Sequence, residues 1–159
     1  MIPLPPSRLA ARIRCGETSS LDAVETYLER IDRIDGRVKS YITVAADEAR
    51  ERALEADRAL EQGGLLGPLH GLPIALKDNI DTAGIRTTVG SAFFADRVPE
   101  RDAEVARRLS EAGAVVLGKL AMHEFAYGAT NQNPHYGACR NPWDLERIPG
   151  GSSARYGEC

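Results

Sequence analysis

The chain has 159 residues, of which 43% are hydrophobic and 27% charged, a composition that predicts one globular domain with a buried core. The net charge is −3, and no run of lysine and arginine is available to neutralise a nucleic-acid backbone, so we expect no direct nucleic-acid partner. No apolar run approaches the roughly 18 residues of a membrane span, so we expect no membrane partner either.

The cysteines and the N-terminus suggest the cellular compartment. Cys15, Cys139 and Cys159 are widely separated and lack the spacing of a metal site, so we expect reduced thiols. The N-terminus lacks the basic, hydrophobic and small-residue regions of a secretory signal. Together these features predict a cytoplasmic protein.

Residues 1–64 predict a helical N-terminal part. A short helix over residues 7–15 precedes Gly16, and Ser19 is a good N-cap for a second helix that Gly36 would close. The apolar residues of this second helix recur at three- and four-residue steps: Leu21, Val24, Leu28, Ile31 and Ile34. A short strand over residues 40–44 and an alanine-rich helix over residues 45–62 follow.

Residues 65–153 read differently, because glycines and short apolar strands replace the long helices. Residues 72–76 and 114–117 predict strands buried on both faces, and residues 103–112 predict a helix between them with Val105, Ala106 and Leu109 facing inward. A strand-helix-strand unit favours parallel pairing with a right-handed crossover. The fold class predicted for the chain is therefore α/β, with the N-terminal helices packed outside a layered core.

Two segments carry the side chains that could take part in catalysis. Residues 72–79 read LPIALKDN and place Lys77 at the end of an apolar strand, where burial can make a lysine neutral enough to act as a base. Residues 147–153 read RIPGGSS, in which two glycines allow close backbone approach beside paired hydroxyls. Lys77 precedes Ser152 by 75 positions.

In this order and at this separation, the two segments resemble the amidase signature family of Ser-Ser-Lys amide hydrolases. The resemblance extends from about residue 19 to residue 153, and the segments at 71–80, 118–125 and 141–153 carry it. It implies a layered α/β/α fold with a mixed sheet, of which residues 1–159 would form one partial domain. It also implies hydrolysis of the C–N bond of a small carboxylic amide with release of ammonia, without a cofactor or metal.

The resemblance assigns a role to each matching residue. Lys77 matches the catalytic lysine, and Ser152 matches the bridging serine, which the family holds with a cis peptide. A serine hydroxyl is a weak nucleophile until a base removes its proton. A neutral Lys77 would accept that proton through Ser152, and the same relay could protonate the leaving amine.

The sequence departs from the family after Ser153. Residues 154–159 read ARYGEC in place of the family's glycines and small-residue helix, and the family's nucleophilic serine lies roughly two dozen residues beyond the serine pair. We therefore expect the N-terminal part of an amidase, with a divergent tail at residues 154–159 and without its nucleophile.

Two alternatives remain open. The A subunit of a glutamyl-tRNA(Gln)/aspartyl-tRNA(Asn) amidotransferase shares the same segments, so in the complete protein the resemblance allows either a homodimer or an amidotransferase complex. A protein of another class, a non-catalytic truncated remnant, would agree with the missing nucleophile.

Other motifs are weaker. Residues 150–154 approximate a hydrolase nucleophile elbow, but no histidine follows them. His123 and Glu124 would begin a zinc-binding helix only with a histidine at position 127, where Tyr127 stands. We interpret His70 and His135 as turn or capping residues, and Lys119 as a solvated or strand-end charge. Met122, Phe125 and Tyr127 are interpreted as packing residues.

Overall fold

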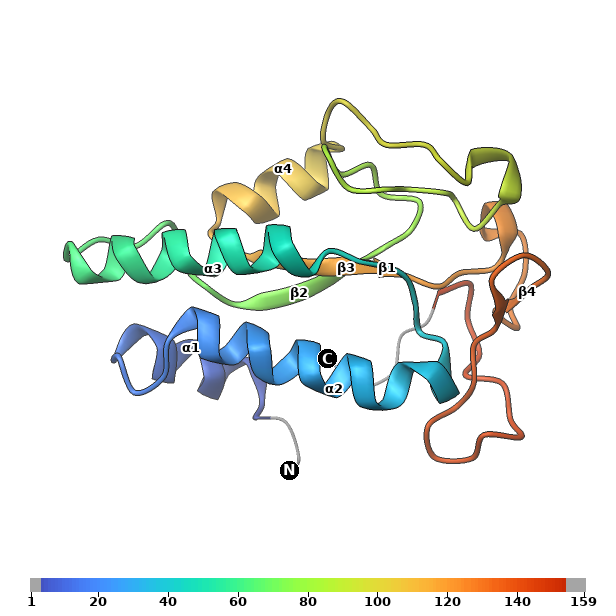
Figure 1. The fold of residues 1–159 in the computed structure, drawn as a ribbon, viewed down its shortest axis with the longest axis horizontal. Coiled ribbons are helices and arrows are strands. Elements are labelled where there is room, and N and C mark those ends of the chain that lie inside the picture. Colours follow the sequence, from blue (N-terminus) through green and yellow to red (C-terminus); the bar gives the residue numbers. More distant parts are fainter. Residues whose placement is uncertain (1–3, 154–159) are drawn as a thin grey trace.

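A computed structural model describes residues 4–153 of the chain (Figure 1). The expected divergent tail at residues 154–159 lies outside the described residues. The α-helices of the described part are α1 (Pro6–Arg14), α2 (Ser20–Val38), α3 (Ala46–Glu61) and α4 (Glu104–Glu111), with short 3-10 turns η1 (Ala92–Phe94) and η2 (Glu124–Ala126). The strands are β1 (Tyr41–Val44), β2 (Pro73–Lys77), β3 (Val115–Leu120), β4 (Gln132–Asn133) and β5 (Gly137–Ala138).

Helix α2 begins where the sequence predicts but ends later. The Ser19 hydroxyl accepts a hydrogen bond from the Asp22 backbone N–H at 2.9 Å, which confirms the predicted N-cap. Gly36 lies inside the helix, so the prediction that it ends there was wrong. The helix continues to Val38 because the Asp35 carboxylate accepts the backbone N–H of Ser40 at 2.7 Å and so fixes the exit beyond the expected end.

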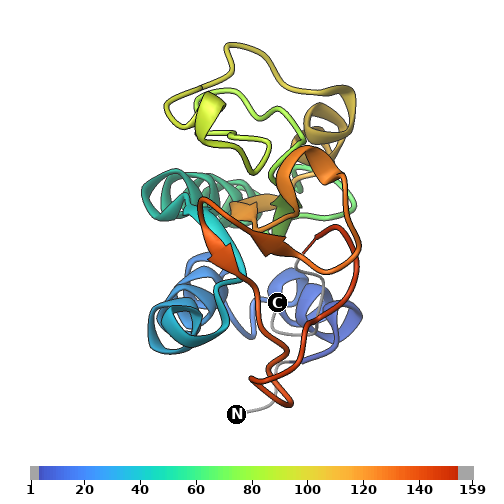
Figure 2. The same ribbon diagram turned by 90° about the vertical axis from the view of Figure 1, so that its right-hand side faces the viewer.

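The main sheet has the order β1-β3-β2. β2 is parallel to β3, with Pro73 opposite Val115 and Lys77 opposite Leu120, which confirms the predicted parallel unit. β1 is antiparallel to β3, so the sheet is mixed. Figure 1 shows α1 and α2 on one side of these strands, and α4 with the long connection before it on the other. This arrangement, seen end-on in Figure 2, confirms a layered α/β fold.

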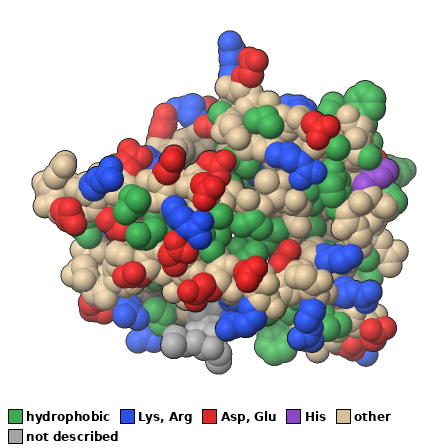
Figure 3. Space-filling model, in the orientation of Figure 1, with side chains coloured by type: hydrophobic (Ala, Val, Ile, Leu, Met, Phe, Trp, Pro, Cys, Tyr) green, Lys and Arg blue, Asp and Glu red, His purple; other side chains and the backbone are tan. Residues whose placement is uncertain are grey.

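The alanines of α3 let it lie close to α2. Ala49 and Ala53 are fully buried in one cluster with Val24 and Leu28 of α2, and the β3 side chains Val115 and Leu117 complete that cluster. At the rim, Arg50 donates to Glu25 at 2.7 Å and joins the two helices. On the face shown in Figure 3, acidic and basic side chains are interspersed over these helices.

Two burial predictions, one for α4 and one for β2, were wrong. Val105 is 48% exposed, because α4 directs Ala106 towards the core and Val105 lies on the outer side beside the ion pair of Glu104 with Arg108. Strand β2 is largely half-buried instead of covered on both faces, because it lies at the edge of the sheet beside an open groove. None of the described helices is long and apolar enough to cross a membrane.

Candidate active site

The structure brings Lys77 and Ser152 into direct contact. Lys77 is the last residue of β2, and its Nζ donates a hydrogen bond to the Ser152 Oγ at 2.7 Å, across 75 positions of sequence. This distance is within the range that proton transfer requires. The two residues that the sequence places in one site therefore meet in the structure.

The surroundings of Lys77 favour its neutral form. Burial lowers the pKa of Lys77 below the ordinary value of 10.5, because a surrounding of low polarity disfavours the ammonium. A lysine with a lowered pKa is a better proton acceptor near neutral pH than a solvated lysine.

Ser152 is held by the segment that follows β3. Met122 and Ser153 form an antiparallel bridge, and the His123 backbone N–H donates to the Ser152 carbonyl at 3.3 Å. Strand β3 thus ends opposite Lys77, and the residues that follow it hydrogen-bond to the serine pair. Gly150 and Gly151, at φ 77° and 72°, turn the chain into this bridge with a backbone that other residues rarely adopt.

The cis peptide expected at Ser152 is not seen, since residues 4–153 contain no cis peptide bond. A non-proline cis bond costs about 3–4 kcal/mol and persists only where the surroundings impose it.

Lys77 and Ser152 line a groove of about 760 Å³. Strand β2 forms its floor, and Leu9 of α1, Tyr27 of α2 and Pro149 are among its walls. A largely apolar groove with a few convergent polar groups is the usual form of a small-molecule site.

Comparison with known proteins agrees with this geometry. Residues 22–156 match the family model described as Amidase. The chain belongs to the amidase family. Curated relatives include the A subunit of glutamyl-tRNA(Gln) amidotransferase from Moorella thermoacetica, 54% identical over 86% of this chain and 28% of the relative. The protein of the same name from Geobacter sp. (strain M21) is 44% identical over 91% of this chain and 30% of the relative.

Solved structures give the same result. The peptide amidase from Stenotrophomonas maltophilia superposes with a TM-score of 0.86 at 39% identity, over 92% of this chain and 31% of that one. A chain from a vestigial protein complex, described in connection with an s-triazine catabolic enzyme, superposes with a TM-score of 0.91 at 39% identity, over 95% of this chain and 33% of that one. This amidase-family chain thus spans about a third of the length of the relatives it matches, or slightly less.

Lys119 of this amidase-family chain is not the solvated charge that the sequence suggested. Its side chain is fully buried, and its Nζ donates to the Ile80 carbonyl and to the hydroxyls of Thr82 at 3.0 Å and Thr87 at 2.8 Å. Burial lowers the pKa of Lys119 to about 8. Lys119 does lie at the end of β3, as the other interpretation had it. The solvated one was wrong because the acceptors come from a loop about 35 residues earlier in the chain, and a pattern around position 119 cannot show them.

Of the remaining predictions near the site, some are confirmed and others were wrong. Met122 is fully buried, as expected of a packing residue, and His70 accepts the Leu66 backbone N–H on its Nδ1 at 3.0 Å, as expected of a turn-capping residue. Phe125 is 54% exposed and Tyr127 90% exposed, so their interpretation as packing residues was wrong. Phe125, at φ 51°, lies in a tight turn that directs its ring outward.

Sequence reasoning also missed two buried polar residues. Asp78 and Asn133 are 0% and 5% exposed and are hydrogen-bonded to the loops around the site. The only signal for Asp78 was its place directly after Lys77. Asn133, in a polar stretch between glycines, had none.

Proposed function

We propose that the chain supplies the lysine and the bridging serine of an amide hydrolase. The observation that carries the proposal is the 2.7 Å contact between Lys77 Nζ and Ser152 Oγ, which both line one groove, in a chain of the amidase family. In this scheme a neutral Lys77 accepts the Ser152 proton while Ser152 accepts the proton of a nucleophilic serine.

The later proton transfers run in reverse. Once the nucleophile has attacked the amide carbon, Lys77 returns its proton through Ser152 to the leaving nitrogen, and the C–N bond breaks to release ammonia and leave the acyl group on the nucleophile. Water then cleaves this ester, giving one proton to the relay, which returns it to the nucleophile, and the carboxylic acid leaves. A nucleophile from the part of the amidase fold outside residues 4–153 completes this scheme. The reaction requires no cofactor, and a small carboxylic amide is the substrate.

The second candidate is a component of an amidotransferase complex. The names of the curated relatives favour it, since those with 41–54% identity are named as A subunits of glutamyl-tRNA(Gln) amidotransferases. The first candidate is favoured instead by the solved structures that are named as amidases, such as the peptide amidase. Both candidates use the same Lys77–Ser152 pair, and they differ in partners. Cytoplasmic location and a homodimer stay predictions.

The test uses a chimaera in which residues 1–153 of this chain replace the matching segment of the Moorella thermoacetica relative. The chimaera is expressed alone and with the other subunits of that host, and ammonia release is measured from glutamine and from simple amides. We expect turnover that Lys77→Ala and Ser152→Ala each reduce by about 10²-fold or more, the usual effect of removing a proton-transfer group. Full turnover in both variants would reject the proposed relay.

A second chimaera, in which the same residues replace the matching segment of the peptide amidase, separates the two candidates. A segment suited to an amidase without partners would support turnover in that host, whereas a segment of an amidotransferase would support turnover only in the Moorella host with its subunits. A properly folded chimaera that shows no turnover on any amide would support the non-catalytic remnant.

A further inference from the structure

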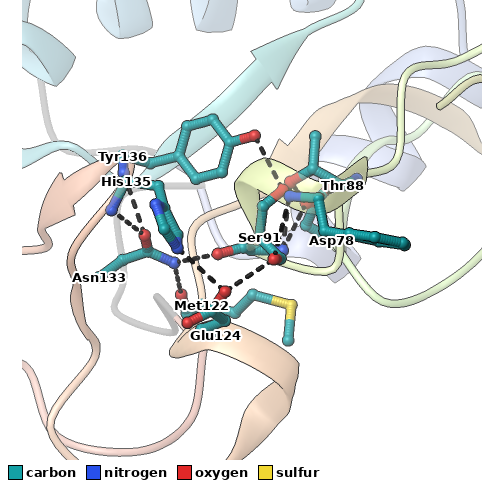
Figure 4. A network of polar contacts seen from close by, with 10 residues as sticks. Asp78, Thr88, Ser91, Met122, Glu124, Asn133, His135 and Tyr136 are labelled. Atoms are coloured by element: carbon teal, nitrogen blue, oxygen red, sulfur yellow. Dashed lines mark hydrogen bonds and ion pairs between the residues drawn. The ribbon is translucent and has the colours of Figure 1, made fainter. Parts of the chain in front are cut away.

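Asn133 links the two loops that hold the proposed catalytic pair. It lies in β4 and is 5% exposed, and its Nδ2 donates to the Gly90 carbonyl at 2.6 Å and to the Met122 carbonyl at 2.9 Å (Figure 4). These acceptors belong to segments more than 30 positions apart in sequence. The Asn133 amide therefore joins two parts of the chain that are otherwise linked here by one backbone hydrogen bond, from the Phe125 N–H to the Val89 carbonyl at 3.0 Å.

The other side of the Asn133 amide is also occupied. Its Oδ1 accepts the backbone N–H groups of His135 at 2.8 Å and Tyr136 at 3.0 Å, in the turn that joins β4 to β5. Both amide hydrogens and the oxygen are thus hydrogen-bonded in a buried place. Such a fully satisfied network favours one geometry over others.

One arm of the link leads to Lys77. The Gly90 backbone N–H donates to the Asp78 Oδ2 at 3.2 Å, and the same oxygen accepts the Thr88 backbone N–H at 3.0 Å and the Thr88 hydroxyl at 2.5 Å. The Asp78 carbonyl accepts the Val89 N–H at 3.1 Å. Because Asp78 directly follows Lys77, these bonds fix the end of the strand from which the lysine side chain projects.

The other arm leads to Ser152. Met122, whose carbonyl Asn133 holds, bridges to Ser153, and the next residue, His123, donates its backbone N–H to the Ser152 carbonyl. The position of Ser152 therefore depends on the segment that the Asn133 amide ties to Gly90.

A second set of contacts links the same two loops. The Ser91 hydroxyl donates to Glu124 at 2.6 Å, and His135 Nε2 lies 2.9 Å from the same carboxylate oxygen. The Tyr136 hydroxyl donates to the Ser91 carbonyl at 3.3 Å. Figure 4 shows Asn133 beside His135 and Tyr136, with Ser91 and Glu124 in the same network.

We propose that Asn133 is a positioning residue that sets the distance between Lys77 and Ser152 by holding the Gly90 and Met122 carbonyls together. The inference rests on the proposed function and goes beyond it, since Asn133 touches neither reacting atom. The side chain has to be a neutral amide, because two carbonyl oxygens require two donors, and an aspartate of the same shape would offer them only lone pairs.

The test compares four variants in the chimaera. Asn133→Asp keeps the shape and removes the donors, and Asn133→Ser keeps one donor in case the aspartate does not fold. Gln132→Ala is the control at the exposed neighbouring position of β4. Leu28→Ala is the control for a general loss of stability, because it opens a cavity in the α2–α3 cluster.

We expect the Asn133 variants to lower kcat by about 10- to 100-fold with KM changed less than about threefold, since a misplacement of about 1 Å can cost on the order of 10²-fold. The acid limb of the kcat/KM profile should also move to higher pH, because a loosened pair admits water and relieves the burial that lowers the pKa of Lys77. Gln132→Ala and Leu28→Ala should change neither kcat per folded molecule nor the position of the limb.

Several results would overturn the role of Asn133. One is a kcat within about threefold of the parent in both Asn133 variants while Ser152→Ala remains inactive, which would leave the proposed function intact. Another is a loss of total activity that the loss of folded protein accounts for fully, as expected for Leu28→Ala, with no movement of the acid limb. Full activity of Ser152→Ala would reject the relay and the positioning role together.

Discussion

Lys77 and Lys119 lie on neighbouring parallel strands and project to opposite faces of the sheet. Lys77 is opposite Leu120, so Lys119, one position earlier on β3, points the other way. Lys77 opens into the groove with Ser152, whereas Lys119 is fully buried under the loop that follows β2. Burial lowers the pKa of both lysines, but we expect different consequences when each is changed.

Replacing Lys77 should abolish activity without unfolding the protein. In the chimaera, Lys77→Ala should reduce kcat/KM by about 10²-fold or more, because the proton acceptor is removed. The free energy of unfolding should change by only about 0.5 kcal/mol, since the side chain is partly solvated. Steady-state ammonia release and thermal melting provide the two measurements, with exposed Lys39→Ala as the control. A loss of only a few-fold would mean that Lys77 is not the base.

Activity should depend on pH through the neutral form of Lys77. The pKa of Lys77 in the folded protein is below its ordinary value of 10.5. The value of kcat/KM should therefore be highest above the folded pKa and should fall as the pH drops through it. The midpoint of this limb, measured between pH 5 and about 10.5, should therefore lie below that of a solvated lysine. A midpoint at or above the ordinary value would contradict burial as the source of the basicity.

Lys119 should make stability rise with pH. Its pKa is about 8 in the folded protein against an ordinary 10.5, so between these values the unfolded chain binds more protons and stability increases with pH. The contribution is fully present above the unfolded pKa and lost as the pH falls through about 8. Burial raises the pKa of Cys139 to about 11, which acts in the opposite sense above the ordinary thiol value of 9.0.

The measurement is therefore a difference between two proteins. Melting temperatures of the parent chimaera and of Lys119→Met are compared at pH 7.5 and pH 9, where Cys139 contributes least. The gap between parent and variant should widen towards the higher pH, because methionine lacks the titrating group. At either pH the variant leaves the Thr82 and Thr87 hydroxyls and the Ile80 carbonyl without their donor, which costs about 1–3 kcal/mol. An equal gap at both pH values would show that the pKa of Lys119 is not lowered.

The chain of 159 residues expressed by itself should be inactive and poorly stable. Strand β2 is an edge strand beside an apolar groove of about 760 Å³, and unpaired edges and exposed apolar surface promote association. Gel filtration and thermal melting test the stability, and ammonia release from simple amides tests the activity. A soluble monomer with a cooperative melt would contradict the first expectation. Turnover that depends on Ser152 or Ser153 would contradict the second, because one of the pair would then act as nucleophile.

The sequence by itself determined the elements that depend on local chemistry. The Ser19 cap, the alanine face at Ala49 and Ala53 and the apolar run before Lys77 are each specified by neighbouring residues, so the helices and the parallel strands could be predicted. The pairing of Lys77 with Ser152 was also predictable, but through resemblance to a family.

Only the tertiary structure decided which polar groups are buried together. Lys119 and Asn133 resemble ordinary surface residues in sequence, yet each is buried because its partners come from distant loops that fold over it. Burial and long-range hydrogen bonds depend on which segments meet in space, and the spacing of residues along one segment does not contain that information.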